Sequence, residues 1–469
     1  MRGLHATFSA LIGTALVAVL PSCDRARDDG VTRVEFWTLD LGPFETYINS
    51  RLSLYESLRK SEGAEVEILW VDVPFDTVDR KLIAAAAAKR APDVVNFSDM
   101  TFARFVSLGA LIDLRPHLSE ADIDAYLPGA RSIAEIDGAL LATPWYLTTQ
   151  TIIANTELLR EGGIEPDALP ASWSGLRALA GPYRARTGRT LFSAPLGRES
   201  ILPGIMLAEG VVPFAERDGR LVADFNKPEV IAFLREWVDV FRAGDIPREA
   251  AAGGFAHIVR LYQGRQIALM NSSPNFLRRI RDEAPSVFDQ TIVRPAVTGA
   301  LGRTHIATMV LGVTTQSDEP AEAARFAAWM TNGANQLAFC KGVNILPSVG
   351  SALDDAYFAP PPTPQAGEPE DPDHLIAESR ALAAEALRSA VAFTPALETW
   401  PDLRRAFEDR FTALLFSDSD TVERAAADIQ RAWADILDAA APASLDAVPR
   451  PEPSDRLEHT LSHAAALLP

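Results

Sequence analysis

Residues 65–97, EVEILWVDVPFDTVDRKLIAAAAAKRAPDVVNF, decide the fold class of this chain. Residues 65–71 alternate apolar and polar side chains with the period of a half-buried strand. Residues 77–90 are rich in alanine and predict a helix, and residues 92–97 predict a short buried strand. Upstream, residues 31–37 predict another strand, and residues 44–60 place apolar side chains at helical spacing. Successive strand and helix units favour an α/β fold with a parallel-rich sheet between layers of helices.

Length and composition indicate a large protein that folds in water. With 469 residues the chain exceeds the size at which one hydrophobic core stops growing, so we expect two lobes. Apolar residues make up 48% of the chain and charged residues 23%, as in ordinary globular proteins. The formal net charge of -19 opposes binding to phosphate backbones, and we expect no nucleic acid partner.

The first thirty residues have the pattern of an export signal. Arg2 precedes an apolar run over residues 8–20, which is too short to span a bilayer that needs about 20 residues. Ser22 marks a cleavage point directly before Cys23, so residues 1–22 are a predicted signal peptide and residues 23–30 a tether. A Cys at this place resembles the lipidation site of bacterial lipoproteins, which implies an anchored periplasmic or cell-surface protein. Pro21 departs from that pattern and leaves plain secretion with a free Cys23 as the alternative.

The rest of the chain continues the alternation of strands and helices. Extended segments at 139–146 and 150–155 suggest a crossing between lobes, and residues 266–271 predict a buried strand. Helices are expected at 230–242, 321–330 and 335–340, and residues 374–441 are expected to be almost entirely helical. Residues 360–373 form a predicted loop, and residues 442–469 a flexible tail. Cys340 is expected to be a free buried thiol.

Short segments in a fixed order carry a resemblance to a known family. The chain resembles the sugar-binding proteins of ABC importers, the class of maltose-binding protein, over residues 31 to 440. The segments that carry the resemblance are Phe36-Trp37-Thr38, Val73-Pro74-Phe75-Asp76, Ala91 to Asn96, Gly109 to Leu114, Gly138 to Tyr146, Asn155 to Leu159, Gly162-Gly163-Ile164, Ser172 to Leu176, Asp224 to Glu229, Ala268 to Asn271, Ala321 to Trp329 and Gln336 to Phe339.

The resemblance implies a two-lobed periplasmic-binding-protein fold with strand crossovers between the lobes and a helical C-terminal region. It places residues 31–145 and 272–330 in the N-terminal lobe and residues 146–271 and 331–441 in the C-terminal lobe. Hinges are expected near residues 141–146, 270–273 and 330–336. The two lobes would close over a carbohydrate or polyol and release it chemically unchanged. We expect a monomer that serves the membrane subunits of an ABC importer.

Candidate ligand-binding residues follow strands or the crossing segments. Open α/β sheets bind ligands at the carboxyl ends of their strands, and sugars need planar polar groups together with aromatic faces. The candidates are Trp37, Asp40, Phe75, Asp76, Asp99, Met100, Trp145, Tyr146, Asn271, Ser273, Asn275, Thr308 and Met309. Trp37 also fits a core position, Asp76 and Asp99 also fit helix caps, and Trp173 fits a structural role better.

Three departures from the family pattern concern specificity. Residues 271–276 replace an aromatic cluster, residues 307–309 replace a Gly-Gly-Trp segment, and Thr394-Pro395 replaces Arg-Pro. From these departures we expect a ligand that is smaller than a long glucan or differently decorated.

Other readings of the sequence remain open. The same fold binds polyamines and polyol phosphates, and a secreted glycosidase needs only two carboxylates among the 63 acidic residues. The chain lacks the sequence motifs of serine hydrolases, zinc proteases and nucleotide-binding loops, so we expect no catalytic residue, no cofactor and no metal site.

Overall fold

The structure is a computed structural model that describes residues 29–440 and Val448, apart from residues 75–76, 137, 198, 344, 364–370, 372 and 396. The predicted signal peptide, Cys23 and nearly all of the predicted tail therefore lie outside the described residues, as do Phe75 and Asp76. The side chains of residues 43, 79, 99 and 100 also lie outside them.

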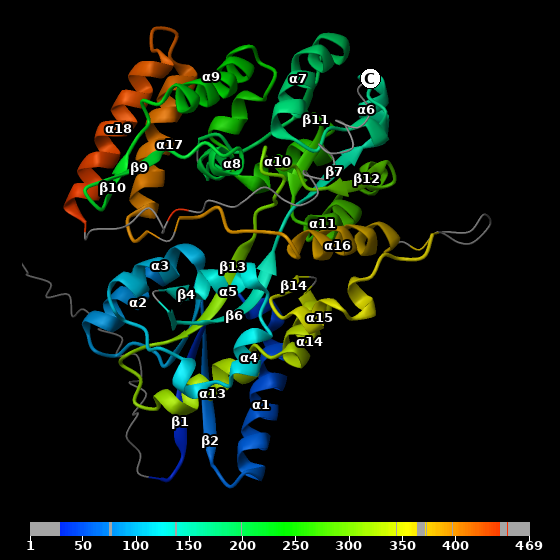
Figure 1. The fold of residues 1–469 in the computed structure, drawn as a ribbon. Coiled ribbons are helices and arrows are strands. Elements are labelled where there is room, and N and C mark those ends of the chain that lie inside the picture. The colour runs from blue at the N-terminus through cyan, green and yellow to red at the C-terminus, as the bar shows by residue number, and fades with distance from the viewer. Residues whose placement is uncertain are drawn as a thin grey trace, which may run out of the picture.

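A six-stranded sheet organises the first lobe, which is the lower body in Figure 1. Its strand order is β14-β6-β13-β3-β1-β2. The strands are β1 (Thr32–Leu39), β2 (Val66–Val73), β3 (Val94–Ser98), β6 (Thr143–Thr148), β13 (Ala307–Val313) and β14 (Leu346–Pro347). β1 is parallel to both β2 and β3, as the alternating strand and helix pattern predicts, but β13 and β14 run antiparallel to their neighbours. The sheet is therefore mixed.

Helices cover this sheet because their apolar faces complete its core. They are α1 (Glu45–Ser61), α2 (Val78–Ala87), α3 (Asp99–Ser107), α4 (Glu120–Asp124), α5 (Pro128–Ala134), α13 (Pro320–Met330), α14 (Gly333–Val343) and α15 (Gly350–Leu353). A short ladder joins β4 (Glu135–Ile136) to β5 (Ala139–Leu140). Cys340 on α14 is buried and free, as expected, and burial raises the pKa of its thiol.

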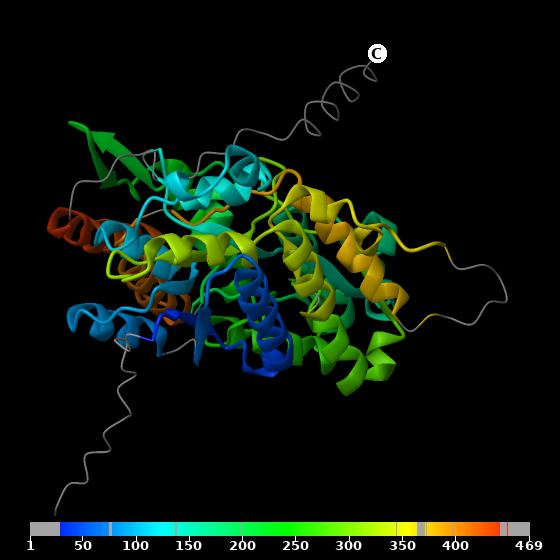
Figure 2. The same ribbon diagram turned by 90° about the horizontal axis from the view of Figure 1, so that it is seen from below.

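A four-stranded sheet organises the second lobe, in the order β12-β7-β11-β8. Its strands are β7 (Thr151–Asn155), β8 (Thr190–Phe192), β11 (Ile267–Ser272) and β12 (Thr291–Pro295). The hairpin of β9 (Phe214–Arg217) and β10 (Arg220–Ala223) projects at the rim of the molecule in the view from below (Figure 2).

Most of the helices after β7 belong to the second lobe. They are α6 (Thr156–Glu161), α7 (Trp173–Thr187), α8 (Leu202–Ala208), α9 (Pro228–Arg242), α10 (Phe255–Gln263), α11 (Phe276–Glu283), α12 (Pro285–Phe288), α17 (Trp400–Phe416) and α18 (Val422–Ala439). α16 (His374–Leu387) lies between the lobes in Figure 1, with Ile376 in a cluster of the second lobe and Leu387 in the core of the first.

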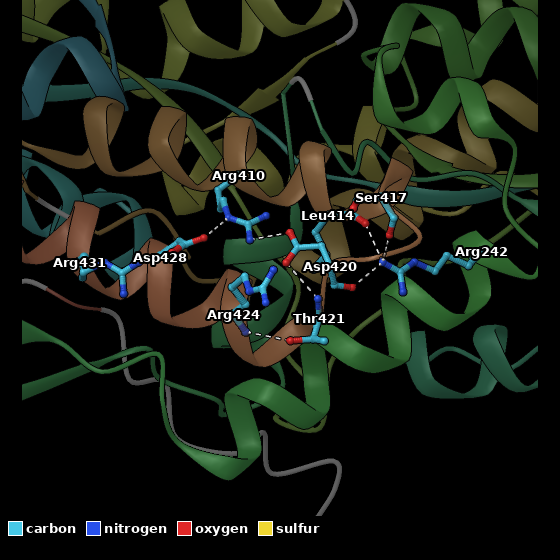
Figure 3. Close-up of polar contacts among 9 residues, drawn as sticks. All are labelled: Arg242, Arg410, Leu414, Ser417, Asp420, Thr421, Arg424, Asp428 and Arg431. Carbon is cyan, nitrogen blue, oxygen red and sulfur yellow. Dashed lines mark hydrogen bonds and ion pairs between the residues drawn. The ribbon is translucent and has the colours of Figure 1, made fainter.

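Polar contacts fix the C-terminal helix pair to the rest of the second lobe (Figure 3). Arg242, from α9, donates to the carbonyl oxygens of Leu414 and Ser417 at 2.8 and 2.7 Å, at the end of α17. Arg410 pairs with Asp420 at 2.6 Å and with Asp428 at 2.7 Å, which joins α17 to the loop before α18 and to α18 itself. The hydrogen bonds from Arg242 satisfy carbonyl groups that a helix end leaves without partners.

Strand pairing corrects two of the expected lobe boundaries. β12 pairs with β7 over residues 291–295, so residues 272–295 lie with the second sheet and not with the first. β14 pairs with β6, so residues 333–347 lie with the first sheet and not with the second. β12 pairs antiparallel with β7, and β14 pairs antiparallel with β6. Such pairings between strands that are far apart in the chain cannot be predicted from a single sequence.

Three stretches that run between the lobes lie away from the expected hinges. The first is Thr149-Gln150 between β6 and β7, and the second is residues 296–306 between β12 and β13. The third is residues 388–399, which leave the first core at Ala390 and enter the second at Phe393. The described residues of this third stretch are not helical, although we expected residues 374–441 to be almost entirely helical.

Candidate binding site

A cavity of about 460 Å³ lies where the second lobe meets the three stretches that run between the lobes. Its volume falls within the range of small-molecule sites, roughly 300 to 1,000 Å³. We call it the main cavity. Its lining includes Gln150, Trp173, Glu199, Ser200, Ile201, Pro203, Gly204, Ile205, Ala208, Phe255, Val297, Gly299, Arg303, His305, Phe393, Thr394, Trp400 and Arg404.

Aromatic rings form part of the wall of the main cavity. Trp173 is the first residue of α7, where the Ser172 hydroxyl accepts a hydrogen bond from the Gly175 N–H at 3.2 Å. Trp173 and Trp400 are each 5% exposed, because Trp237 and Trp433 pack against them at ring distances of 5.7 and 6.0 Å. The core thus holds both rings rigidly and leaves only a margin of each open to the cavity.

The start of α8 forms a second part of the wall. Ser200 precedes this helix, and its N–H donates to Oε1 of Glu408 at 3.0 Å. The same carboxylate lies 3.5 Å from Nε of Arg404, which also lines the cavity. Burial raises the pKa of Glu408, although Arg404 and the Ser200 N–H lower it. This pair therefore joins α17 to the loop that carries Ser200.

Asn271, a predicted ligand residue, positions two parts of the wall. Its Nδ2 donates to Oε1 of Gln150 at 2.5 Å, and its Oδ1 accepts from the Val297 N–H at 3.0 Å. Gln150 and Val297 both line the main cavity, whereas Asn271 stands behind them and is 8% exposed. The amide that replaces the family's aromatic cluster thus connects two of the stretches that run between the lobes.

His305 connects all three of these stretches. Thr149 donates its hydroxyl to the carbonyl oxygen of His305 at 2.9 Å, and the N–H of Phe393 donates to Nδ1 of the His305 ring at 3.1 Å. Since a backbone N–H can only donate, Nδ1 is an acceptor, and the proton of the neutral ring is on Nε2. The ring also stacks on Phe393 at 6.1 Å between centroids.

Trp145 requires a correction. We expected its ring to stack on a ligand, but the side chain is 1% exposed and lies in the core of the first lobe. Its ring stacks on Phe339 at 5.1 Å and contacts Phe36 at 6.2 Å. No face of Trp145 is open to a ligand, because the sheet directs this residue into the core.

The other predicted residues of the first sheet lie near the ends of its strands. Trp37 is half-buried, and its Nε1 donates to Glu35 at 2.7 Å. Asp40 is exposed and has a φ of 50°. The loop that follows is held by Asp72, a residue that the sequence analysis did not select, which accepts from the N–H groups of Leu41 and Gly42 at 3.0 and 2.8 Å.

Tyr146, Thr308 and Met309 lie on the paired strands β6 and β13. Tyr146 and Met309 are opposite one another and half-buried, and burial raises the pKa of the Tyr146 hydroxyl. Thr308 is 1% exposed, and its hydroxyl has no hydrogen-bond partner among the described residues. These side chains do not appear in the described lining of the main cavity.

Ser273 and Asn275 line a separate small pocket with Arg380 at the start of α11. Asp99 and Met100 begin α3, where Ser98 caps the helix by accepting from Thr101 N–H at 3.3 Å. Of the thirteen predicted ligand residues, none whose side chain is described lines the main cavity, and Asn271 reaches it through other residues.

Residues of the main cavity that were not predicted from the sequence come from helices and loops far apart in the chain. Trp173 was assigned a structural role, and Thr394 was noted only as a departure from a family pattern. Ser200, Phe255 and His305 carried no signal in the sequence, because their neighbourhood exists only in the folded chain. A signal was present for Trp173, since an N-cap serine fixes a Trp at the beginning of a helix.

Two features of the described residues bear on other classes of function. No three or more His, Cys, Asp or Glu side chains there are grouped so that they could hold a metal ion. None of the helices in this part of the chain combines the length and apolar character needed to cross a membrane.

Comparisons with known proteins identify relatives over most of the chain. Residues 54–366 match the family described as bacterial extracellular solute-binding protein. A structure from Synechococcus sp. MITs9220, described as an oligosaccharide periplasmic-binding protein, is 32% identical, with a TM-score of 0.77 over 87% of this chain and 99% of that one.

More distant structures share the fold. The GacH receptor of Streptomyces glaucescens is 20% identical, with a TM-score of 0.68 over 88% of this chain and 100% of that one. The sugar-binding protein MalE of Xanthomonas citri is 18% identical, with a TM-score of 0.70 over 87% and 98%. These likenesses agree with the two-lobed α/β fold expected from the sequence.

Proposed function

This chain belongs to the bacterial extracellular solute-binding protein family, and from that premise we propose that it binds a carbohydrate in the main cavity and delivers it to an ABC importer. The proposal is supported by the relative that is 32% identical and described as an oligosaccharide periplasmic-binding protein. The ligand would leave the protein chemically unchanged.

The composition of the main cavity is the observation that carries this proposal. A sugar presents hydroxyl groups at its rim and C–H groups on its faces, so its site needs polar groups beside aromatic rings. Rings of Trp173, Phe255, Phe393 and Trp400 line the cavity. Gln150, Ser200 and Thr394 contribute groups that accept or donate hydrogen bonds without a net charge.

The charges that line the main cavity favour a sugar over the alternatives. A polyamine would need several carboxylates, whereas Glu199 is the only carboxylate among the described lining residues. Arg303 and Arg404 would attract a polyol phosphate, but Arg303 donates to the carbonyl oxygen of Ser389 at 3.2 Å and Arg404 pairs with Glu408. Glycoside hydrolysis needs a pair of carboxylates at the scissile bond, and the described lining of the main cavity contains one.

Export and anchoring extend the proposal beyond the cavity. We propose that the chain is exported and that Cys23 is lipidated, so that the protein stays at a membrane surface as a monomer. Mass spectrometry of the mature protein from a membrane fraction should find a diacylated N-terminal Cys23. A soluble mature protein with an unmodified thiol would support plain secretion instead.

Thermal unfolding with a panel of ligands tests the proposed function. The panel contains maltose, cellobiose, xylobiose and their tetrasaccharides, together with spermidine and glycerol 3-phosphate. A bound sugar should raise the melting temperature, because a ligand at 100 times its Kd adds about 2.7 kcal/mol to the free energy of unfolding. Chromatography should recover the sugar intact. A shift with spermidine or glycerol 3-phosphate alone would overturn the carbohydrate proposal.

A further inference from the structure

A second cavity, of about 430 Å³, adjoins the main cavity at the start of α10. We call it the side cavity. Its described lining consists of Glu199, Glu249, Ala252, Gly253, Gly254, Ala256, His257 and Arg260. Glu199 belongs to the linings of both cavities, so the two spaces meet at its side chain.

The backbone holds Glu199 at this junction in an unfavourable conformation. Its φ is 57°, in the left-handed region that residues other than glycine enter at a cost of about 1 to 2 kcal/mol. Non-glycine residues in this region cluster at functional sites, where the surrounding structure holds them. The Glu199 side chain forms no hydrogen bond or ion pair with any described residue, so local pairing does not account for its position.

Glycine at position 254 makes room for the Glu199 carboxylate. A Cβ at Gly254 would lie 2.0 Å from Oε2 of Glu199, closer than any two such atoms can approach. Gly254 immediately precedes the first residue of α10, where the positive end of the helix dipole favours a negative charge. The carboxylate therefore lies beside a helix start while its oxygens keep free acceptor sites.

His257 supplies a donor on the same side cavity. Nη2 of Arg260 lies 3.3 Å from Nδ1 of His257, and since arginine can only donate, Nδ1 is the acceptor. The ring proton is then on Nε2, which is buried and has no partner among the described residues. A buried donor without a protein partner indicates a missing acceptor from a ligand or from water.

We propose that the side cavity is a second subsite for the same ligand, which is therefore an oligosaccharide that spans both cavities. This inference rests on the proposed function. Glu199 and Glu249 accept hydrogen bonds, whereas His257 and Arg260 donate them. Hydroxyl groups do both, so a further sugar ring matches this mixed lining. A phosphate would be repelled by the two carboxylates. A polyamine only donates hydrogen bonds, so it would leave Arg260 and Nε2 of His257 without an acceptor.

Calorimetric titration with matched sugars tests the second subsite. The probes are maltose, cellobiose and xylobiose, each compared with the tetrasaccharide of its series. In the series that binds, the tetrasaccharide should bind at least tenfold more tightly to the wild-type chain than the disaccharide. Ala256→Trp places a large ring in the side cavity and should abolish this gain, with the disaccharide still bound. Ala84→Trp, at an exposed position of α2 in the other lobe, is the control and should keep the gain.

Glu249→Leu provides an independent test in case Ala256→Trp perturbs α10, because Glu249 is exposed and lies outside that helix. Glu249→Leu should likewise lose the tighter binding of the tetrasaccharide relative to the disaccharide. Equal affinities for the disaccharide and the tetrasaccharide in the wild-type chain would overturn the second subsite alone. The second subsite would also be overturned if the tetrasaccharide still binds more tightly than the disaccharide in both Ala256→Trp and Glu249→Leu. If no sugar of any series binds to the folded wild-type chain, the proposed function fails as well.

Discussion

Glu199 combines a strained backbone with an unpaired carboxylate, and the two properties predict a trade-off. Glu199→Gly should raise the free energy of unfolding by about 0.5 to 1 kcal/mol, because relief of the left-handed strain exceeds the added entropy of the unfolded chain. The same change should weaken sugar binding about tenfold, since a hydrogen bond to a charged group contributes about 1.5 to 3 kcal/mol. Chemical denaturation and calorimetry would measure the two effects.

A matched control for this prediction exists in the first lobe. Lys89 is exposed and also left-handed, with a φ of 55°. Lys89→Gly should stabilise the chain by a similar amount and leave the affinity unchanged. If Glu199→Gly binds sugar as tightly as the wild-type chain does, the carboxylate does not contact the ligand.

Asn271 shows how a predicted ligand residue can act without touching the ligand. Asn271→Leu would leave the Val297 N–H and Oε1 of Gln150 without partners, and each unsatisfied group costs about 1 to 3 kcal/mol. We expect lower stability together with weaker sugar binding. Asn335→Leu removes a buried amide that donates to the carbonyl oxygen of Trp329 at 2.6 Å in the first lobe. It should reduce stability but not affinity, and equal affinity losses in both variants would contradict the positioning role.

The carboxyl group of Glu408 predicts a dependence of stability on pH. Burial raises its pKa in the folded state, so the folded chain keeps a proton at pH values where the unfolded chain has lost it. The charged group therefore reduces stability above the folded pKa, and this loss disappears as the pH falls below the ordinary value of 4.5. Glu408→Gln keeps an oxygen for the Ser200 N–H. It should raise the melting temperature at pH 7 and have little effect at pH 4.

Glu283 is the control for the sign of this effect. Its hydrogen bonds from Arg279 and Gln263 lower its pKa, so its charged form stabilises the folded chain at neutral pH. Glu283→Gln should lower the melting temperature at pH 7, in the opposite direction to Glu408→Gln. A decrease in both variants would show that the Arg404 ion pair outweighs the burial of Glu408.

At the scale of elements, α8 offers a way to close the main cavity without damage to the fold. Gly204 lies within this helix, and a Cβ there would meet only Cβ of Phe393 at 3.8 Å. Gly204→Leu should stabilise α8 by up to about 1 kcal/mol, because glycine is a poor helix former. The larger side chain should fill part of the cavity and prevent sugar binding.

Gly342 is the matched position for this change. It is exposed on α14, and no atom lies within 4 Å of a Cβ built there. Gly342→Leu should give a similar gain in helix stability, and sugar should still raise its melting temperature. Sugar binding by Gly204→Leu at wild-type affinity would place the ligand outside the main cavity.

Elements with a strong local pattern were predicted well from the sequence. The alternation at residues 31–37 and 65–71 corresponds to β1 and β2, and the apolar face predicted for residues 230–242 corresponds to α9, with Phe233, Trp237 and Phe241 buried. The non-helical stretch that begins at residue 388 was not predicted, because helical patterns lie on both sides of it in the sequence. Local periodicity reports the burial of one face but not where a chain leaves one lobe for the other.

At the scale of the whole molecule, the binding site could not be predicted residue by residue. We expected side chains at the strand ends of the first sheet to bind the ligand, whereas the main cavity is lined by residues near positions 150, 200, 255, 305 and 400. These positions meet because β7, β11 and β12 pair in one sheet and the chain returns to the second core at Phe393. The order of family segments predicted the two lobes, whereas the site depends on contacts between distant parts of the chain.

The arrangement of the stretches between the lobes leads to a final prediction about closure. His305 connects Thr149 and Phe393 by hydrogen bonds, so the three stretches can move as one hinge beside the main cavity. A sugar that contacts these stretches and the second lobe together favours the closed arrangement by its differential affinity for it. Small-angle X-ray scattering of the wild-type chain should therefore show a smaller radius of gyration with the bound sugar. Gly204→Leu should show no change with the same sugar, because its cavity is filled. Identical wild-type scattering curves with and without a calorimetrically saturating sugar would show that binding does not close the lobes.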